Sequence, residues 1–467
     1  MLLVCYYILG LMLWNCYYRK GIKFLVLQMH WKDLLSLKRQ GDTKKRLRTD
    51  QNNLRSGFEV DYDRIIFSSA FRHLQDKTQV IPFSQSGFVH TRLTHSLEVS
   101  VVGRSLGRAV GNAVIQKHPA LAVTHGYQPH DFGTIVAAAC LAHDIGNPPF
   151  GHSGEQAIGD FFTSGAGTAL ISSLTEAQQQ DLIRFEGNAN GFRIVTQDRE
   201  GVPGGLRLSY ATLGTFTKYP KASIPIQPSQ KVSDKKFGFF QAQSAFFSEV
   251  ANELGLQGPH NSFHRHPLAF LVEAADDICY TLIDFEDGIN LGWIPESYAL
   301  EYLIKLVKDY IDTDKYKQLQ TTTDRLAYLR ALSIGVLIED ATRIFMEHEE
   351  EILAGEFPYA LLKKCKYTAQ VEDIIKLSKE KIYCSEEVIE KEVKGYRAIH
   401  HILEVLSHAV IRQSAQKTTA LDRLALNLLP EIIRFSPEDR YQQLLQTSCF
   451  VAGLTDGQAL LWHKKLS

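Results

Sequence analysis

The sequence predicts an all-α protein, and three features of the chain support this fold class. Apolar residues recur at three- and four-residue spacings in four segments, which span residues 94–115, 134–145, 266–289 and 301–311. Stretches with the alternating pattern of strands are scarce. The composition is that of an ordinary globular protein, with 45% hydrophobic and 22% charged residues, which excludes disorder as the main state.

The chain of 467 residues is long enough for two or three structural units. We expect a helical core over residues 29–300 and an additional C-terminal helical region over residues 301–467. Residues 1–28 form an extension of doubtful status, since the apolar run from Leu2 to Trp14 is shorter than the roughly 20 residues of a transmembrane helix. Three interpretations stay open: a mis-assigned start with Met29 opening the true chain, a helix that packs in the core, and a weak membrane anchor.

A long loop is expected at residues 198–238, where glycine and proline residues concentrate. Loops of this length in compact domains are usually functional lids or disordered insertions. An anionic partner would explain the concentration of lysines, while a solvated loop is the alternative. The lysines of this loop are Lys218, Lys221, Lys231, Lys235 and Lys236.

Charge and cysteine content restrict the partners and the compartment. The chain has 51 Lys and Arg against 52 Asp and Glu, so any phosphate or nucleic-acid site must be local. Its seven cysteines show neither CxxC spacing nor the density of a disulfide scaffold, which favours a reducing cytoplasmic location. We expect no membrane association.

The strongest local signal is an apolar helix that ends in a histidine and an aspartate. His143 and Asp144 close this helix, which Gly146, Pro148 and Pro149 then stop. At a helix end both side chains can reach one ion, and imidazole with carboxylate suits a transition ion or Mg²⁺. Taken alone the pair is weak evidence, because an exposed pair at a helix end is the commoner explanation.

Two other helices contribute polar residues to apolar surroundings. His95 stands at the front of one long helix, three residues after Arg92. Asp276 lies in the middle of another, where burying an unpaired carboxylate is costly, so a cation must meet it. Tyr280 and Asp284 follow at four and eight residues and share the helix face of Asp276.

The ordered set of His95, His143, Asp144 and Asp276 resembles the H…HD…D signature of the HD-domain metal-dependent phosphohydrolases. Six blocks across about residues 61–292 also resemble the deoxyguanosinetriphosphate triphosphohydrolase family, whereas the C-terminal third matches less distinctly. The resemblance implies a helical HD-domain core, the four residues as metal ligands, and Mg²⁺ or Mn²⁺ as the cofactor, with another transition ion as the alternative. The blocks are DRIIFSSAFRHLQDKTQV, TRLTHSLEVS, LAHDIGNPPFGHSGEQAI, FEGNANGFR, YATLGTFTKYP and EAADDICYTLIDFEDG.

The same resemblance implies catalytic and substrate-binding roles. His152 and Glu155 match the catalytic histidine and its acidic partner, although His152 could instead cap a turn. The implied substrate contacts are Gln79 and Asp284 on the deoxyribose 3′-hydroxyl, Tyr280 against C2′, and Arg92, Asn188, Lys218 and Tyr219 on the triphosphate, with Lys235 or Lys236 as an addition. Asp277 departs from the vertebrate branch, which has a lysine at this position. The lysines of the 198–238 loop therefore become more important as candidates for binding phosphate. Arg72 is open between a contact to the triphosphate and a purely structural role in helix packing or a salt bridge.

On this resemblance we expect hydrolysis of 2′-deoxynucleoside triphosphates, dGTP foremost, to the deoxynucleoside and inorganic triphosphate. The alternatives are another HD phosphohydrolase, such as a 5′-deoxynucleotidase or a cyclic-nucleotide or alarmone hydrolase, and a non-catalytic protein that senses nucleotides or binds single-stranded nucleic acid. We expect a homo-oligomer, either a tetramer or a hexamer. The base preference, activation by a second dNTP and binding of single-stranded DNA are left open.

Overall fold

The computed structural model describes residues 28–467 except 53–54, 81–88, 199–203, 227–228 and 431–438. Within these described residues the chain is helical, and extended pairing is limited to two isolated bridges. The predicted all-α class is therefore confirmed. The apolar run near the start of the sequence lies outside the described residues. Among the described helices, none combines the length and apolarity needed to cross a membrane.

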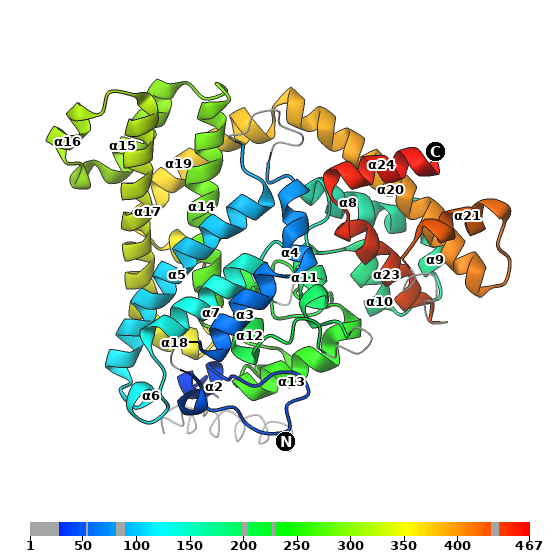
Figure 1. Cartoon of the computed structure of the whole chain (residues 1–467), viewed down its shortest axis with the longest axis horizontal. Helices are drawn as coiled ribbons and strands as arrows, with labels where there is room; N and C mark the ends of the chain where they lie inside the picture. Colours follow the sequence, from blue (N-terminus) through cyan, green and yellow to red (C-terminus); the bar gives the residue numbers. More distant parts are fainter. Residues whose placement is uncertain (1–27, 53–54, 81–88, 199–203, 227–228, 431–438) are drawn as a thin grey trace, which may run out of the picture.

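The helices differ widely in length, and the longest form the frame of the molecule (Figure 1). In chain order they are α2 (Trp31–Leu34), α3 (Gly57–Ile66), α4 (Ser69–His73), α5 (Arg92–Lys117), α6 (Ala120–Val123), α7 (Pro129–Ala142), α8 (Gly151–Thr163), α9 (Thr168–Ile171), α10 (Glu176–Ile183), α11 (Gly187–Thr196), α12 (Tyr210–Phe216), α13 (Ser244–Leu254), α14 (Ala269–Asn290), α15 (Glu296–Val307), α16 (Thr313–Gln318), α17 (Thr322–Glu347), α18 (Glu349–Leu353), α19 (Thr368–Ser378), α20 (Glu386–Ser414), α21 (Ala420–Leu428), α23 (Arg440–Gly453) and α24 (Asp456–Leu466).

The central pair is α5 and α7, whose backbones approach closely because α5 has small residues on the shared face. A Cβ atom on Gly103 would lie 2.5 Å from Sγ of Cys140, and one on Gly111 would lie 2.8 Å from Cβ of Phe132. These contacts show that the two helices run antiparallel. The start of α5 therefore lies beside the end of α7, which brings the two predicted histidine ligands to the same place.

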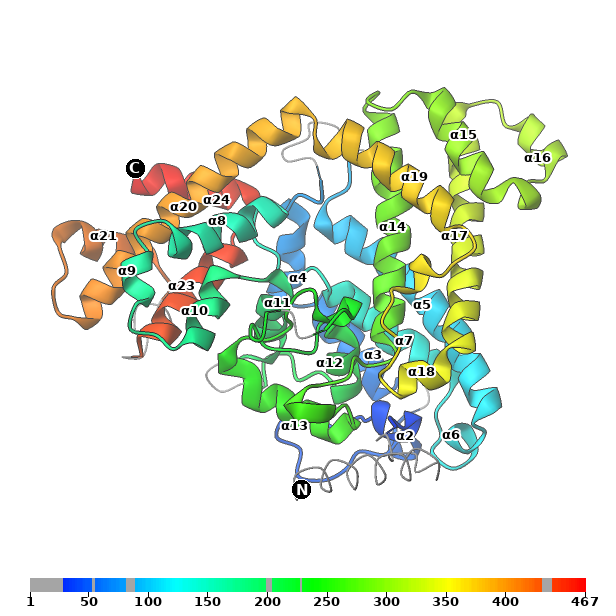
Figure 2. The same cartoon turned by 180° about the vertical axis from the view of Figure 1, so that it is seen from behind.

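Buried apolar residues form two clusters. The first contains the N-terminal segment, α3, α5, α7 and α12 to α19. The second joins α8 and α10 to the C-terminal helices α20, α21, α23 and α24, and Figure 2 shows α20 running from the end of α19 across to α8. The boundary expected after residue 300 falls inside α15, and residues 301–467 contribute to both clusters. The C-terminal helices thus support α8, the helix that follows the turn after His143 and Asp144.

The start of α8 has an unusual backbone that the C-terminal helices hold in place. Phe150, the residue before α8, has a φ of 59°, a left-handed conformation that is strained for a bulky side chain. Its amide donates to Oδ1 of Asp456 at 3.0 Å, and its ring packs over Gly395 of α20, where a Cβ would lie 2.3 Å from Cγ. Packing against α20 and α24 therefore fixes the direction in which α8 leaves the turn.

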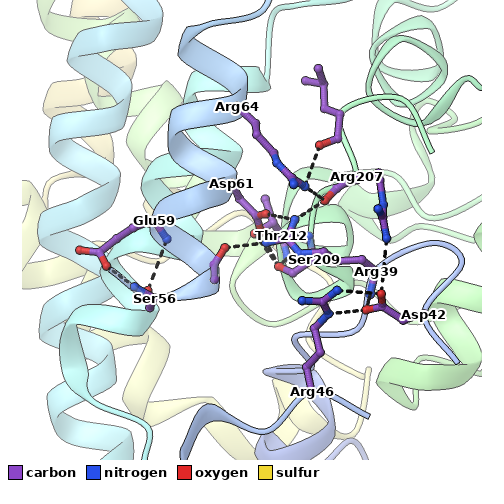
Figure 3. A network of polar contacts seen from close by, with 12 residues as sticks. Arg39, Asp42, Arg46, Ser56, Glu59, Asp61, Arg64, Arg207, Ser209 and Thr212 are labelled. Atoms are coloured by element: carbon purple, nitrogen blue, oxygen red, sulfur yellow. Dashed lines mark hydrogen bonds and ion pairs between the residues drawn. The ribbon is translucent and has the colours of Figure 1, made fainter. Parts of the chain in front are cut away.

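The segment expected as a loop at 198–238 contains a helix. α12 is fully buried. Its N-cap residue Ser209 and the side chain of Thr212 donate to the buried carboxylate of Asp61 on α3, at 2.6 and 2.8 Å. Arg39 forms an ion pair with the same carboxylate at 2.6 Å (Figure 3). This network anchors α12, and the chain leaving α12 reaches Lys218 after one residue. The loop is thus divided into two shorter connections.

Candidate active site

Three helices deliver the predicted metal ligands to one buried point. Nitrogen and oxygen atoms of His95, His143 and Asp144 lie within 4.8 Å of one another, and all three side chains are buried. The two imidazole centroids are 5.3 Å apart in an edge-to-face arrangement. Oδ1 of Asp276 on α14 lies 3.2 Å from Nε2 of His95 and 3.4 Å from Nε2 of His143. The four residues of the predicted H…HD…D set therefore come together.

The tautomer of His143 leaves one nitrogen free for an ion. Nδ1 lies 2.7 Å from the carbonyl oxygen of Cys140, which can only accept, so Nδ1 carries the proton. Nε2 then faces the cluster, and this buried atom has no hydrogen-bond partner among the described residues. Burial opposes a second proton on the ring, yet Asp144 and Asp276 raise the pKa of His143, so the surroundings of Nε2 favour a positive charge, either a proton or a metal ion. An orphaned buried nitrogen between two carboxylates fits a divalent cation, and the donor set of imidazole and carboxylate suits such ions.

Two cations stabilise the ionised carboxylates of this cluster. Nη1 of Arg92 lies 2.5 Å from Oδ2 of Asp144, and Nζ of Lys218 lies 2.8 Å from Oδ2 of Asp276. Burial opposes ionisation, yet Arg92 and the imidazoles hold the pKa of Asp144 well below its usual range. Burial also opposes ionisation of Asp276. The positive charges of Lys218 and His143 outweigh this effect and hold the pKa of Asp276 well below its usual range. Both carboxylates are therefore charged and ready to bind a cation.

His152 and Glu155 form a second group on the first turn of α8. Nδ1 of His152 lies 3.5 Å from Oε2 of Glu155, and 81% of the histidine side chain is exposed, so solvent and substrate can reach it. The other oxygen of Glu155 accepts from the amide of Gly187 at 2.8 Å. Nζ of Lys236 lies 3.8 Å from Glu155 and 3.1 Å from Glu186. Burial and the neighbouring Glu186 raise the pKa of Glu155 to about 7.

The turn between α7 and α8 links the two groups. Asn147 donates to Oδ1 of Asp144 at 2.6 Å. Gly151, which directly precedes His152, lies against the guanidinium of Arg92, since a Cβ there would be 2.7 Å from Nη2. One short segment therefore positions the buried acidic ligand, its arginine partner and the exposed imidazole.

The face of α14 beyond Asp276 meets an aromatic residue from the C-terminal region. Tyr383 donates to Oδ2 of Asp284 at 2.6 Å. Its ring stacks on that of Tyr280, with centroids 5.7 Å apart and an interplanar angle of 12°. Burial raises the pKa of Asp284 to about 7. Tyr280 and Asp284 thus share one face as predicted, and Tyr383 completes it.

The remaining residues that were predicted to contact the substrate lie around these groups. The bridge between Thr78 and Thr91 places Gln79 beside the start of α5, and Asn188 donates to Oε1 of Glu186 at 2.7 Å. Tyr219 follows Lys218, and burial, opposed by Lys218, raises its pKa.

Four of the five loop lysines separate into two sets, and the fifth, Lys235, is exposed. Lys218 and Lys236 pair with carboxylates of the two groups described above. Lys221 donates to the carbonyl oxygens of Pro225 and Ile226, and Lys231 donates to that of Gly355. Asp277 stands where the vertebrate branch has a lysine. Burial and the negative charges of Glu273 and Asp276 raise the pKa of its carboxyl group to about 8. The loop therefore brings two of its lysines to the candidate site.

Three residues of the site were not singled out by sequence reasoning. Glu186 stands two residues before Asn188, inside the FEGN block, so its position was a usable signal. Asn147 follows the HD pair within the same turn. Tyr383 is almost a hundred residues beyond Asp284, in the region that matches the family less distinctly, and no local pattern indicates it.

The comparisons with known proteins agree with this geometry. The HD domain family matches residues 92–183, which run from the start of α5 to the end of α10. A deoxyguanosinetriphosphate triphosphohydrolase-like protein of Synechocystis sp. is 41% identical over 94% of this chain and 99% of its own length. A protein of the same description from Pseudomonas aeruginosa is 39% identical over 92% of this chain and 97% of its own length. The deoxyguanosinetriphosphate triphosphohydrolase of Yersinia pestis is 30% identical over 89% of this chain and 95% of its own length.

The helical fold, the clustered H…HD…D residues and the matched domain define an HD-domain protein of the phosphohydrolase type. The relatives span nearly the whole chain, including its C-terminal helices. The chain belongs to the deoxyguanosinetriphosphate triphosphohydrolase family.

Proposed function

We propose that this protein hydrolyses 2′-deoxynucleoside triphosphates, dGTP foremost, to the deoxynucleoside and inorganic triphosphate. In this reaction water adds to the α-phosphorus, the bond from phosphorus to the 5′-oxygen breaks, and the 5′-oxygen takes a proton. The observation that carries the proposal is the convergence of a buried imidazole and carboxylate cluster with an exposed His–Glu pair along one turn of the chain. The names of the relatives support dGTP as the substrate.

The donor set of the cluster fits a divalent ion, for which we propose Mg²⁺ or Mn²⁺. His95, His143, Asp144 and Asp276 would hold it. When bound, such an ion supplies Lewis-acid polarisation of a phosphate oxygen. Lys218 neutralises Asp276 in the free protein at 2.8 Å, so it is placed to turn toward substrate phosphate when the carboxylate gains another cation.

His152 is the residue proposed to handle the proton. Surrounding protein atoms that partly desolvate the ring, together with the nearby Lys236, lower its pKa in the free protein although most of its surface is exposed. A substrate with about four negative charges would favour its protonated form. Oε2 of Glu155 lies 3.5 Å from Nδ1 of the imidazole, so the carboxylate can orient the protonated ring, and Oε1 of Glu155 is itself held by the amide of Gly187. The opposite nitrogen, Nε2, is then directed to solvent, where it can orient water or protonate the 5′-oxygen.

Arg92, Lys236, Asn188 and Tyr219 are proposed to receive the triphosphate, since guanidinium and ammonium groups complement phosphate charge. The sugar would lie on the face formed by Tyr280 and Asp284, near Gln79. There a carboxylate can accept from the 3′-hydroxyl, and the tyrosine ring fills the space beside C2′. Tyr383 fixes both groups through its hydrogen bond and its ring stacking.

Four expectations about assembly, ligands and location remain predictions. They are the homo-oligomeric state, activation by a second dNTP, binding of single-stranded DNA and a cytoplasmic location.

Product analysis by anion-exchange chromatography tests the proposed function. The purified protein would be incubated with each of the four dNTPs, with dGMP and with a cyclic dinucleotide, in Mg²⁺ or Mn²⁺. Free triphosphate with deoxyguanosine from dGTP supports the proposal. Turnover of dGMP or the cyclic dinucleotide alone would assign another HD phosphohydrolase activity, and no turnover of any compound would favour a binding protein.

A further inference from the structure

A buried lysine connects three segments that are far apart in the sequence. Lys77 lies between α4 and α5 and is 3% exposed. Its Nζ donates to the carbonyl oxygen of Asn147 at 2.6 Å and to that of Ala452 at 2.8 Å. No carboxylate of the described chain forms an ion pair with it, and burial lowers its pKa to about 7. An apolar residue would fill this space without the cost of desolvating an amine, so the two hydrogen bonds are the feature that Lys77 adds.

The two carbonyl groups belong to the C-terminal helices and to the turn after the HD pair. Ala452 is in the last turn of α23, where the aligned backbone dipoles favour a positive charge. Asn147 is in the turn between α7 and α8, and its side chain donates to Oδ1 of Asp144 at 2.6 Å. Lys77 therefore joins α23 to the residue that holds one of the proposed metal ligands.

The backbone of Lys77 acts on the other oxygen of the same ligand. Its carbonyl oxygen accepts from the amide of Arg92, the first residue of α5, at 3.0 Å. Nη1 of Arg92 in turn lies 2.5 Å from Oδ2 of Asp144. Each oxygen of Asp144 is thus reached from Lys77 through one intermediate residue, either Asn147 or Arg92. Because these two contacts fix the plane of the carboxylate, a shift of Lys77 would turn the carboxylate relative to the two imidazoles.

Asp456, the first residue of α24, makes a parallel connection. It is 2% exposed, and its Oδ1 accepts from the amide of Phe150 at 3.0 Å. Its Oδ2 accepts from the amide of Thr78 at 3.0 Å and from the hydroxyl group of the same threonine. Phe150 has the left-handed backbone from which α8 begins, and His152 is on the first turn of that helix. One carboxylate therefore ties α24 both to the residue after Lys77 and to the start of the helix that carries His152.

These contacts attach the C-terminal helices to the candidate active site at two points, and Figure 1 and Figure 2 show α24 beside α8. We propose that Lys77 and Asp456 are positioning residues, through which α23 and α24 set the orientation of Asp144 and His152. In the described part of the chain neither side chain hydrogen-bonds to the metal-ligand cluster or to His152, so each acts through the residues between. This inference rests on the proposed function, because it concerns the geometry of that site.

The first test measures metal affinity, because Lys77 acts on Asp144. The full chain is dialysed against a series of Mn²⁺ concentrations, and bound metal is quantified by elemental analysis. We expect Lys77→Met, which keeps a side chain of similar length without the amine, to lower the affinity roughly 10-fold. Tyr441→Phe is the matched control, since it removes a buried hydrogen bond from α23 to Asp181 of α10 and leaves the contacts of the turn in place. It should lower the melting temperature and bind Mn²⁺ like the wild type.

The second test measures turnover of dGTP at saturating metal, because Asp456 acts on His152. We expect Asp456→Ala to lower kcat roughly 10-fold or more, with a smaller change in KM. Asp456→Asn keeps one acceptor oxygen, so its kcat should lie between those of Asp456→Ala and the wild type. Tyr441→Phe should keep the wild-type kcat. Residues that only stabilised the fold would lower the melting temperature when replaced and leave the Mn²⁺ affinity and kcat of the folded protein unchanged.

Circular dichroism and thermal melts establish that each variant is folded at the assay temperature. Asp456→Asn is the mildest change and keeps the test open if another variant does not fold. Wild-type Mn²⁺ affinity in Lys77→Met would overturn the role of Lys77, and wild-type kcat in both Asp456 variants would overturn that of Asp456. An equal loss in Tyr441→Phe would overturn both. Absence of dGTP turnover in the wild type would refute the proposed function and leave the Mn²⁺ measurement as the test of Lys77.

Discussion

The charge environment of Glu155 provides a quantitative test of its proposed role. Lys236 lies 3.8 Å from Glu155 and stabilises its ionised form, while Glu186 and burial oppose ionisation and bring the pKa to about 7. If the ionised carboxylate orients His152, kcat should fall as the pH drops through this pKa. The Lys236→Gln variant removes the stabilising cation, so the acid limb of the pH profile of kcat should move to higher pH.

The size of the shift follows from the distance and the exposure. At 3.8 Å and an effective dielectric constant of about 20, the attraction is about 4 kcal/mol, or about 3 pH units. Lys236 is 31% exposed and is shared with Glu186 at 3.1 Å, so solvent and the second carboxylate reduce the effect. We expect the limb to rise by about 1–2 pH units, with kcat at pH 7 about 5- to 50-fold lower.

The assay is the pH dependence of kcat for dGTP at saturation, which separates the shift from weaker phosphate binding. Glu186→Gln removes a like charge and should move the limb in the opposite direction. Lys235→Gln changes the adjacent exposed lysine, for which no ion pair occurs in the described chain, and should leave the limb in place. The reasoning is refuted if the limb stays fixed in Lys236→Gln, or if Lys235→Gln shifts it equally.

Four further substitutions separate the proposed roles. Asp144→Ala should abolish both metal binding, measured by elemental analysis, and turnover, because it removes a ligand and leaves Arg92 unpaired. His152→Ala should lower kcat by roughly 10²-fold or more and leave dNTP affinity nearly unchanged, as checked by single-turnover kinetics and equilibrium binding. Tyr280→Ala should raise the GTP to dGTP ratio of kcat/KM by opening the space beside C2′. Tyr383→Phe should raise KM for dGTP about 5-fold or more, because Asp284 loses its hydrogen bond at 2.6 Å.

Each of these has a clear contrary result. Full metal content and a near-normal rate in Asp144→Ala would remove this residue from the ligand set. An unchanged kcat in His152→Ala would move the proton donor elsewhere. For Tyr280→Ala, a folded protein with the wild-type ratio would make the tyrosine a core residue only, and an unaltered KM in Tyr383→Phe would separate that hydroxyl from sugar binding.

Most residues of the buried histidine and aspartate cluster could be predicted from the order of motifs along the chain. His143 and Asp144 are adjacent, and Asp276 was conspicuous as a carboxylate within an apolar helix, for which a cation was expected. The structure supplies that cation as Lys218, at 2.8 Å. The antiparallel packing of α5 and α7 then explains why His95, nearly fifty residues earlier, joins the cluster.

Contacts between distant segments could not be predicted in the same way. Tyr383 reaches Asp284 because α19 and the following turn pack over α14, and no local periodicity specifies that packing. The helix within the 198–238 loop was missed because glycine and proline residues on either side of it indicate a loop. The hydrogen bond from Ser209 to the buried carboxylate of Asp61 stabilises this helix.

The site of water attack tests the central claim most directly. Hydrolysis of dGTP in H₂¹⁸O, followed by mass spectrometry of both products, locates the incoming oxygen. Because attack at the α-phosphorus breaks the bond to the 5′-oxygen, the account predicts one ¹⁸O atom in intact inorganic triphosphate and none in deoxyguanosine. Label in deoxyguanosine, or release of orthophosphate or pyrophosphate in place of triphosphate, would contradict it.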